Sequence, residues 1–102
     1  MTAPRVVISG IGVVSPLGVG PQQFWGALCA GRSGIAPLDG LAPDGGVPHV
    51  AAAVRDFAPR EFITSLHYRR MDALSRMTVA ACRMALDDAR ALPGLDLQRL
   101  GI

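Results

Sequence analysis

Residues 5–18 read RVVISGIGVVSPLG, and this stretch decides the fold class. Residues 5–9 form a β-branched apolar run bounded by glycine, which predicts a short strand. Because the run is continuously apolar rather than alternating, we expect this strand to be covered on both faces, as in an α/β sheet. Residues 10–20, with four glycines and one proline, predict a loop. The stretch therefore predicts a buried strand followed directly by a glycine-rich loop.

Gly10 and Gly12 raise the hypothesis of a nucleotide-binding turn. A dinucleotide fingerprint needs a third small residue and a helix that starts at once. Here Ser15 and a proline follow, and the next helix is predicted to start only at Pro21. No GKS or GKT is present, and the first acidic residue, Asp39, lies in a long loop. The sequence favours glycines that let the backbone pass close to packed neighbours, and a Rossmann-type nucleotide-binding protein stays as the less favoured alternative.

Residues 21–31, PQQFWGALCAG, predict a short amphipathic helix. Proline is favoured at the first helical position, and Gly31 is a natural C-terminal stop. At about 100° per residue, one arc collects the apolar side chains that we expect to face the core. These are Phe24, Trp25, Leu28 and Cys29.

The middle of the chain predicts weaker elements. Residues 32–48 are rich in Gly, Pro and Asp and have no helical period, which predicts a long surface loop. Residues 50–54 predict a second strand, and PREFI at residues 59–63 predicts one helical turn.

Residues 69–92, RRMDALSRMTVAACRMALDDARAL, predict the longest element, a helix of about 20 residues and about 30 Å. Asp72 is the predicted N-cap, with Ser75 three positions on. Arg69 and Arg70 would oppose the helix dipole, so we expect an acidic residue from elsewhere to pair with them. An apolar arc is expected to face the core, and it holds Met71, Leu74, Thr78, Ala81, Cys82, Ala85, Leu86 and Ala89.

The end of the chain predicts a return to strand. PGLD at residues 93–96 ends the long helix, and RLGI at residues 99–102 predicts the beginning of another strand. The order strand–helix–strand–helix–strand is typical of an α/β domain. We expect residues 1–102 to be the front of a larger domain, with the last strand cut short.

Composition narrows the class of protein. Half of the residues are hydrophobic and 18% are charged, which is typical of a globular chain. The net charge of +2 is too small to indicate nucleic acid or an anionic membrane as partner. No apolar stretch is long enough to span a bilayer and no secretory signal is present, so we expect a cytoplasmic protein. Cys29 and Cys82 lack CxxC spacing, and no metal or cofactor site is predicted.

Four motifs together resemble a known family. RVVISGIGVVSPLG, FWGALCAGRSGI, RRMDALSRMTVAACRMALDDA and RLGI are similar, in order and at matching spacing, to the N-terminal part of β-ketoacyl-[acyl-carrier-protein] synthases. Type II condensing enzymes and polyketide ketosynthases are the most similar members, and the resemblance covers essentially the whole chain. It implies a thiolase-like fold of αβαβα layers, of which residues 1–102 would be the incomplete beginning of the N-terminal domain.

The resemblance also implies a function. Such enzymes are acyltransferases that catalyse a decarboxylative Claisen condensation of an acyl thioester with malonyl-acyl carrier protein, in fatty-acid or polyketide biosynthesis. They work with an acyl carrier protein as homodimers or heterodimers. The family's catalytic cysteine and two histidines are expected beyond Ile102, so no catalytic residue is assigned here and the 102 residues alone are expected to be inactive. The alternative is a non-catalytic partner subunit of the chain-length-factor type.

The remaining candidates favour structural roles. Cys82 lies mid-helix on the apolar arc and Cys29 lies at a helix C-terminus, so both are expected to be buried and unreactive. His49 and His67 are expected at element boundaries. Ser33, in GRSGI, is expected to form a turn.

The arginines of the long helix carry one further hypothesis. Arg69, Arg76, Arg83 and Arg90 recur every seven residues on the side opposite the apolar arc. This stripe is a candidate docking surface for an acidic carrier protein. However, Asp72–Arg76 and Arg83–Asp87 are spaced i,i+4, which favours a solvated face with ion pairs worth about 0.2–0.5 kcal/mol each.

Overall fold

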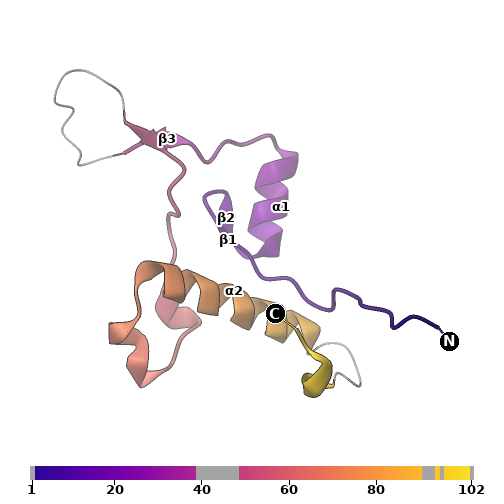
Figure 1. Ribbon diagram of the computed structural model, residues 1–102. Helices are drawn as coiled ribbons and strands as arrows, with labels where there is room; N and C mark the ends of the chain where they lie inside the picture. Colours follow the sequence, from indigo (N-terminus) through magenta and orange to yellow (C-terminus); the bar gives the residue numbers. More distant parts are fainter. Residues whose placement is uncertain (1, 39–48, 91–93, 95, 102) are drawn as a thin grey trace. The chain divides into compact units, whose positions relative to one another are not determined.

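The computed structural model describes residues 2–38, 49–90, 94 and 96–101 (Figure 1). The chain divides into two compact units, and each is described by itself. Unit 1 comprises Met1–Gly12 and Pro59–Ile102, and unit 2 comprises Val13–Ala58. The described residues form a mixed α/β structure with short strands and two α-helices.

The predicted glycine-rich loop contains a β-hairpin of unit 2. Strands β1 (Val14–Ser15) and β2 (Gly18–Val19) pair antiparallel, with Val14 opposite Val19. The Ser15 hydroxyl accepts a hydrogen bond from the Leu17 N–H at 3.2 Å and donates to the Gly18 carbonyl at 3.0 Å. A Cβ on Gly34 would lie 2.7 Å from the Cβ of Pro16, so the SPLG and GRSGI motifs pack closely against each other.

Helix α1 (Pro21–Cys29) confirms the predicted short helix with proline in its first turn. The Gln23 side chain accepts a hydrogen bond from the Val19 N–H at 3.1 Å and so joins the helix to the hairpin. At the other end Gly31 has φ +68°, and Arg32 donates its N–H to the carbonyl of Ala27 at 3.0 Å. This is a Schellman motif, and it confirms Gly31 as the stop.

The apolar arc predicted for this helix does not face a core in the described residues. Trp25 is 63% exposed, Leu28 is 48% exposed and Cys29 is also exposed. Phe24 is half-buried, and the buried residue of α1 is Ala27. The prediction was wrong because helical periodicity identifies an apolar face, whereas burial needs a neighbouring element to cover it.

A second short ladder lies in the same unit. Strands β3 (Ala36–Pro37) and β4 (Val50–Ala51) pair antiparallel, and the Leu38 N–H donates to the carbonyl of His49 at 2.9 Å. The predicted loop at residues 32–48 therefore includes a strand, and its residues 39–48 lie outside the described residues. The strand predicted at residues 50–54 covers only Val50–Ala51, because only these two residues pair with β3.

Unit 1 is built around helix α2 (Ala73–Ala89), which is preceded by two 3₁₀ turns, η1 (Pro59–Glu61) and η2 (Leu66–Arg70). The turn η1 confirms the helical turn predicted within PREFI. Met71 is extended, with φ −85° and ψ 133°, and it separates η2 from α2. Helix α2 therefore begins directly after the predicted N-cap, Asp72. Arg69 and Arg70, which the sequence placed at the helix start, belong to η2 and lie outside the first turn of α2, where they would have opposed its dipole.

Both strands predicted for the ends of the chain are absent from the described residues. Residues 5–9 form no strand, and Val6, Val7 and Ile8 are 94%, 73% and 85% exposed. At the other end, η3 (Leu97–Arg99) occupies the beginning of the predicted RLGI strand. A strand requires a hydrogen-bonded neighbour, and all of the described strands belong to unit 2. The prediction of a buried first strand was wrong for this reason.

The buried side chains described in unit 1 are two alanines and one isoleucine. Ala80 is fully buried, Ala89 is 2% exposed and Ile63, just after η1, is 4% exposed. Within the predicted arc of α2, Ala81, Cys82, Ala85 and Leu86 are half-buried, but Leu74 and Thr78 are exposed. The buried face of α2 therefore differs from the predicted apolar arc. It includes Ala80, which the predicted arc left out.

Candidate functional site

Gly10 and Gly12 lie directly against the backbone of α2. A Cβ on Gly10 would come within 2.1 Å of the Ala85 carbonyl oxygen, and a Cβ on Gly12 within 1.9 Å of the Ala81 oxygen. Between them, the N–H of Ile11 donates a hydrogen bond of 3.0 Å to the carboxylate of Asp88. The glycines therefore allow close packing, as the sequence favoured. The backbone of α2 occupies the side of each glycine on which a Cβ would lie.

Neither cysteine lies in a reactive setting. Cys29 is exposed at the C-terminal end of α1, so the prediction that it is buried was wrong. Cys82 is half-buried in the middle of α2. Neither thiol lies at a helix N-terminus, a position at which catalytic cysteines are commonly activated. Nothing in this geometry marks either thiol as a nucleophile.

Both histidines are exposed, and Ser33 takes the turn position that the sequence predicted. His49 is exposed beside β4, and His67 is exposed within η2. The Ser33 hydroxyl accepts a hydrogen bond from the Ile35 N–H at 3.2 Å, which confirms the turn. Among the described residues, no group of three or more His, Cys, Asp or Glu side chains is placed to hold a metal ion. No helix in this part of the chain has the length and apolarity to cross a membrane.

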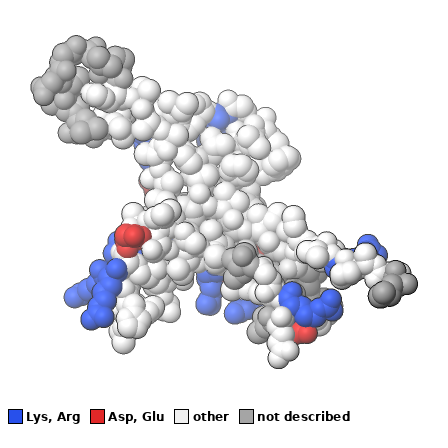
Figure 2. All heavy atoms as spheres, viewed as in Figure 1, with Lys and Arg blue, Asp and Glu red and all other residues white. Residues whose placement is uncertain are grey.

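The predicted arginine stripe separates into two groups. Figure 2 shows basic side chains gathered over the part of unit 1 that carries η1 and η2. We call Arg60, Arg69, Arg70 and Arg76 the arginine cluster. Arg60, Arg69 and Arg70 are exposed, and no ion pair joins any of the four to a carboxylate within the described ranges. The Asp72–Arg76 pair that the spacing predicted is therefore not formed.

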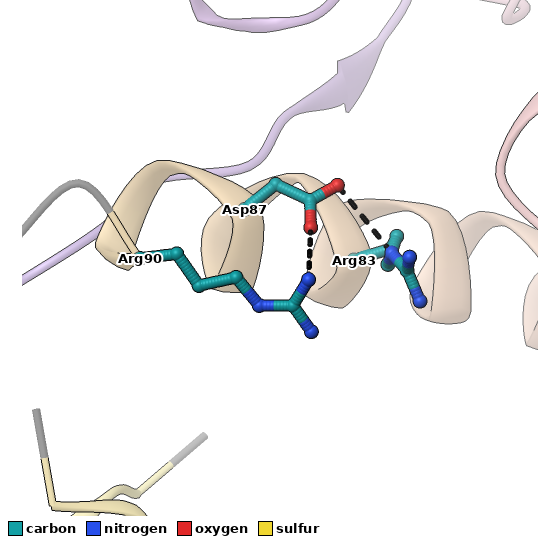
Figure 3. Close-up of polar contacts among 3 residues, drawn as sticks. All are labelled: Arg83, Asp87 and Arg90. Atoms are coloured by element: carbon teal, nitrogen blue, oxygen red, sulfur yellow. Dashed lines mark hydrogen bonds and ion pairs between the residues drawn. The ribbon is translucent and has the colours of Figure 1, made fainter.

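The second group confirms the solvated, ion-paired face. Asp87 lies between two arginines of α2, at 3.4 Å from Nε of Arg83 and 3.3 Å from Nη1 of Arg90 (Figure 3). All three side chains are more than half exposed, so water screens these pairs. Asp87 therefore offsets one of the two positive charges on the helix itself.

Tyr68 contacts two members of the arginine cluster, Arg60 and Arg76, and sequence reasoning did not single it out. The Cζ atoms of Arg60 and Arg76 lie 3.8 and 4.1 Å from the centroid of its ring. Arg76 also donates from Nη2 to the Tyr68 carbonyl at 3.2 Å. These three residues come from η1, η2 and α2. The sequence offers one signal for this contact, because Tyr68 lies eight positions after Arg60 and eight positions before Arg76. No helical or strand period selects this spacing.

Asp72 confirms the predicted N-cap. Its carboxylate accepts a hydrogen bond of 2.7 Å from the Ser75 N–H. This bond, aided by the Ser75 hydroxyl and the charge of Arg76, holds the pKa of the Asp72 carboxyl below its usual value. The cap places the start of α2 directly after η2 and Met71, so that Arg76 of the cluster lies in the first turns of the helix.

The described elements and the ordered motifs are those of a truncated α/β chain of the thiolase-like fold class. The family model "Beta-ketoacyl synthase, N-terminal domain" matches residues 3–102. The chain belongs to the beta-ketoacyl synthase family. This membership displaces the nucleotide-binding hypothesis.

The chain is similar to members of both fatty-acid and polyketide type. It is 37% identical to 3-oxoacyl-[acyl-carrier-protein] synthase 2 of Coxiella burnetii over 87% of its length. It is 32% identical to the tetracenomycin polyketide synthase ketoacyl synthase beta subunit of Streptomyces glaucescens over 91% of its length. Among solved structures, the ishigamide ketosynthase/chain length factor matches with TM-score 0.73 and 38% identity over 93% of the chain.

The chain is much shorter than these relatives. It spans 22% of the Coxiella burnetii protein, 23% of the Streptomyces glaucescens subunit and 23% of the ishigamide chain. The family and the fold class are thus established for a segment that corresponds to less than a quarter of each of these relatives.

Proposed function

We propose that residues 1–102 form the N-terminal portion of a β-ketoacyl synthase N-terminal domain. The protein to which they belong would catalyse decarboxylative Claisen condensation of an acyl thioester with malonyl-acyl carrier protein. The match of the family model over residues 3–102 carries this proposal. The names of relatives from both pathways support a role in fatty-acid or polyketide biosynthesis.

The catalytic cysteine and two histidines of such an enzyme are proposed to lie outside residues 1–102. The settings of the two cysteines support this, since Cys29 ends a helix and Cys82 is half-buried mid-helix. The 102 residues by themselves are then inactive in condensation.

The proposed partner is an acidic acyl carrier protein, and the proposed assembly is a homodimer or heterodimer in the cytoplasm. The arginine cluster supports the first part, because its charges have no carboxylate partner among the described residues. Unneutralised cations on one surface attract an acidic protein and speed its association.

A second candidate function is that of a non-catalytic partner subunit. The similarity to a ketoacyl synthase beta subunit and to the ishigamide ketosynthase/chain length factor favours it. In that case the protein would shape chain length within a heterodimer rather than carry the acyl chain on a cysteine.

Reading the gene past codon 102 tests these two functions against each other. A cysteine codon followed downstream by two histidine codons is expected for the condensing enzyme, and a related frame without the cysteine favours the partner subunit. A frame with no further ketosynthase sequence overturns both.

A condensation assay on the purified 102 residues tests the location of the catalytic groups. With an acyl-carrier protein and malonyl-carrier protein as substrates, we expect no β-ketoacyl product by mass spectrometry. Turnover by this chain would overturn the proposal that its catalytic residues lie elsewhere.

A further inference from the structure

The stacking of two arginines on Tyr68 needs a physical explanation. Its ring lies about 4 Å from both guanidinium carbons, so these two cations are held within roughly 8 Å of each other. Like charges repel at this separation, and the negative face of the ring partly offsets the repulsion. No described carboxylate pairs with Arg60 or Arg76. The arrangement is therefore a preformed pair of cations with no ion pair among the described residues, although the charge of Arg76 also acts on the Asp72 carboxyl.

The hydrogen-bonding capacity of the pair is only partly used. Arg76 donates from Nη2 to the Tyr68 carbonyl, and its Nε is buried without a partner in the described part of the chain. Arg60 is exposed, and the exposed Arg69 and Arg70 follow Tyr68 directly. A carboxylate from outside would relieve the repulsion and could accept hydrogen bonds from the exposed Arg60, whereas the buried Nε of Arg76 stays out of its reach.

Ordering matters for such recognition. A free arginine loses rotamer freedom when it binds a carboxylate, and this loss weakens binding. Arginines already held against a ring lose less. The ring therefore prepares the cluster for an anionic surface before any partner arrives.

We propose that Tyr68 is a positioning residue for recognition of an acidic protein surface. Its ring holds Arg60 and Arg76 in place, so that partner carboxylates meet ordered guanidinium groups. This inference rests on the proposed function, which supplies the acidic acyl carrier protein as partner. Tyr68 acts through the arginines and needs no contact with the partner itself.

The test compares two substitutions of Tyr68 in the 102-residue chain. Binding of purified holo-acyl carrier protein is measured by isothermal titration calorimetry at low and at high salt. Tyr68→Phe keeps the ring and is expected to bind within about twofold of the unsubstituted chain. Tyr68→Leu keeps the bulk but loses the aromatic face, and it is expected to bind about five- to tenfold more weakly, with a shallower salt dependence.

A second variant covers the case in which Tyr68→Leu fails to fold. Arg60 is exposed, so Arg60→Gln is expected to leave the fold intact and to weaken binding to a similar extent. Combined with Tyr68→Leu where that variant folds, it is expected to add little, because both changes remove the same arrangement. Arg83→Gln is the matched control, since Arg83 is paired with Asp87, and it is expected to change binding less than about twofold.

The outcomes separate this inference from the proposed function. Unchanged binding and salt dependence in Tyr68→Leu and Arg60→Gln would overturn the positioning role and leave the carrier-protein partnership standing. Equal weakening by Tyr68→Phe and Tyr68→Leu would also overturn it, because the hydroxyl rather than the ring would then matter. No binding by the unsubstituted chain would overturn the partnership and the inference together. Inorganic polyphosphate binding as tightly, with the same dependence on Tyr68, would overturn the commitment to an acidic protein.

Discussion

Residues 5–9 and residues 10–12 are adjacent in the chain, yet their environments are opposite. The apolar segment is exposed, with Val6 and Ile8 at 94% and 85%. The glycine segment that follows lies so close to α2 that a single added carbon would overlap helix carbonyl oxygens. The more hydrophobic segment is thus the less buried one.

The two segments differ because each needs a different kind of neighbouring element for its burial. Glycine packing needs only a helix backbone, and α2 lies within the same unit. A strand needs a neighbouring strand, and unit 1 has none among the described residues. Hydrophobicity shows that a segment favours burial, but the partner decides whether burial occurs.

The largest effect that tests this comparison is expected at Gly12. In Gly12→Ala, the new Cβ would lie 1.9 Å from the Ala81 oxygen and 2.8 Å from the Ala81 carbonyl carbon, both backbone atoms that cannot rotate away. We expect residues 10–12 to move off α2 at a cost of about 1–3 kcal/mol. Hydrogen exchange at the Ile11 amide and thermal unfolding followed by far-UV circular dichroism measure the change.

Gly26→Ala is the matched control for this prediction. Gly26 lies inside α1, and a Cβ there would meet no atom within 4 Å. The same substitution is expected to stabilise this helix by about 0.5–1 kcal/mol. Identical effects at Gly12 and Gly26 would contradict the close contact.

A smaller effect is expected from Asp88→Ala, which removes the acceptor of the Ile11 N–H. The loss of one exposed hydrogen bond is worth about 0.5–1.5 kcal/mol, and exchange at the Ile11 amide should accelerate accordingly. Asp87→Ala, one residue earlier, breaks two surface ion pairs worth about 0.2–0.5 kcal/mol each. It should leave exchange at Ile11 unchanged. Equal acceleration by both variants would show that Asp88 has no specific role.

Acid is expected to loosen α2 at its beginning. The pKa of Asp72 is lowered by the hydrogen bond from Ser75, so the folded state favours the ionised carboxyl. The cap is therefore fully present above the ordinary aspartate pKa and is lost as the pH falls through the lowered value. Circular dichroism against pH should show this loss of helix in the unsubstituted chain.

Asp72→Asn separates this cap from other acid effects. Asparagine caps helices about as well as aspartate but does not titrate in this range. The variant should lack the component of the acid transition that belongs to the cap. Superimposable pH profiles for the two proteins would exclude a role for Asp72 ionisation.

The smallest effect is expected at Val7, which is 73% exposed. Val7→Thr keeps the β-branched shape and should change the stability of this chain by less than about 0.5 kcal/mol. Thermal unfolding in dilute solution measures it. A loss of more than about 1 kcal/mol would mean that the segment is covered in solution, and the comparison with residues 10–12 would fail.

Local signals predicted the local structure well. Pro21 and Gly31 bounded α1 correctly, Asp72 capped α2, and Ser33 formed its turn. Each of these depends on a few neighbouring residues, so the sequence contains the needed information. The candidate functional site was predicted less well, because the spacing of the α2 arginines suggested one stripe. That spacing did not reveal that Arg76 and Arg60 both contact the ring of Tyr68.

From the sequence alone it was possible to predict the family, the two α-helices, their caps and the packing role of the glycines. These follow from motif order and from hydrogen bonds between near neighbours, which require no distant partner. Only the tertiary structure decided that residues 5–9 are exposed, that α2 is covered around Ala80, and that an aromatic ring gathers two arginines. Those outcomes depend on which surfaces meet. A periodic pattern along one segment does not specify its partner, because the same apolar face is stable against any complementary surface.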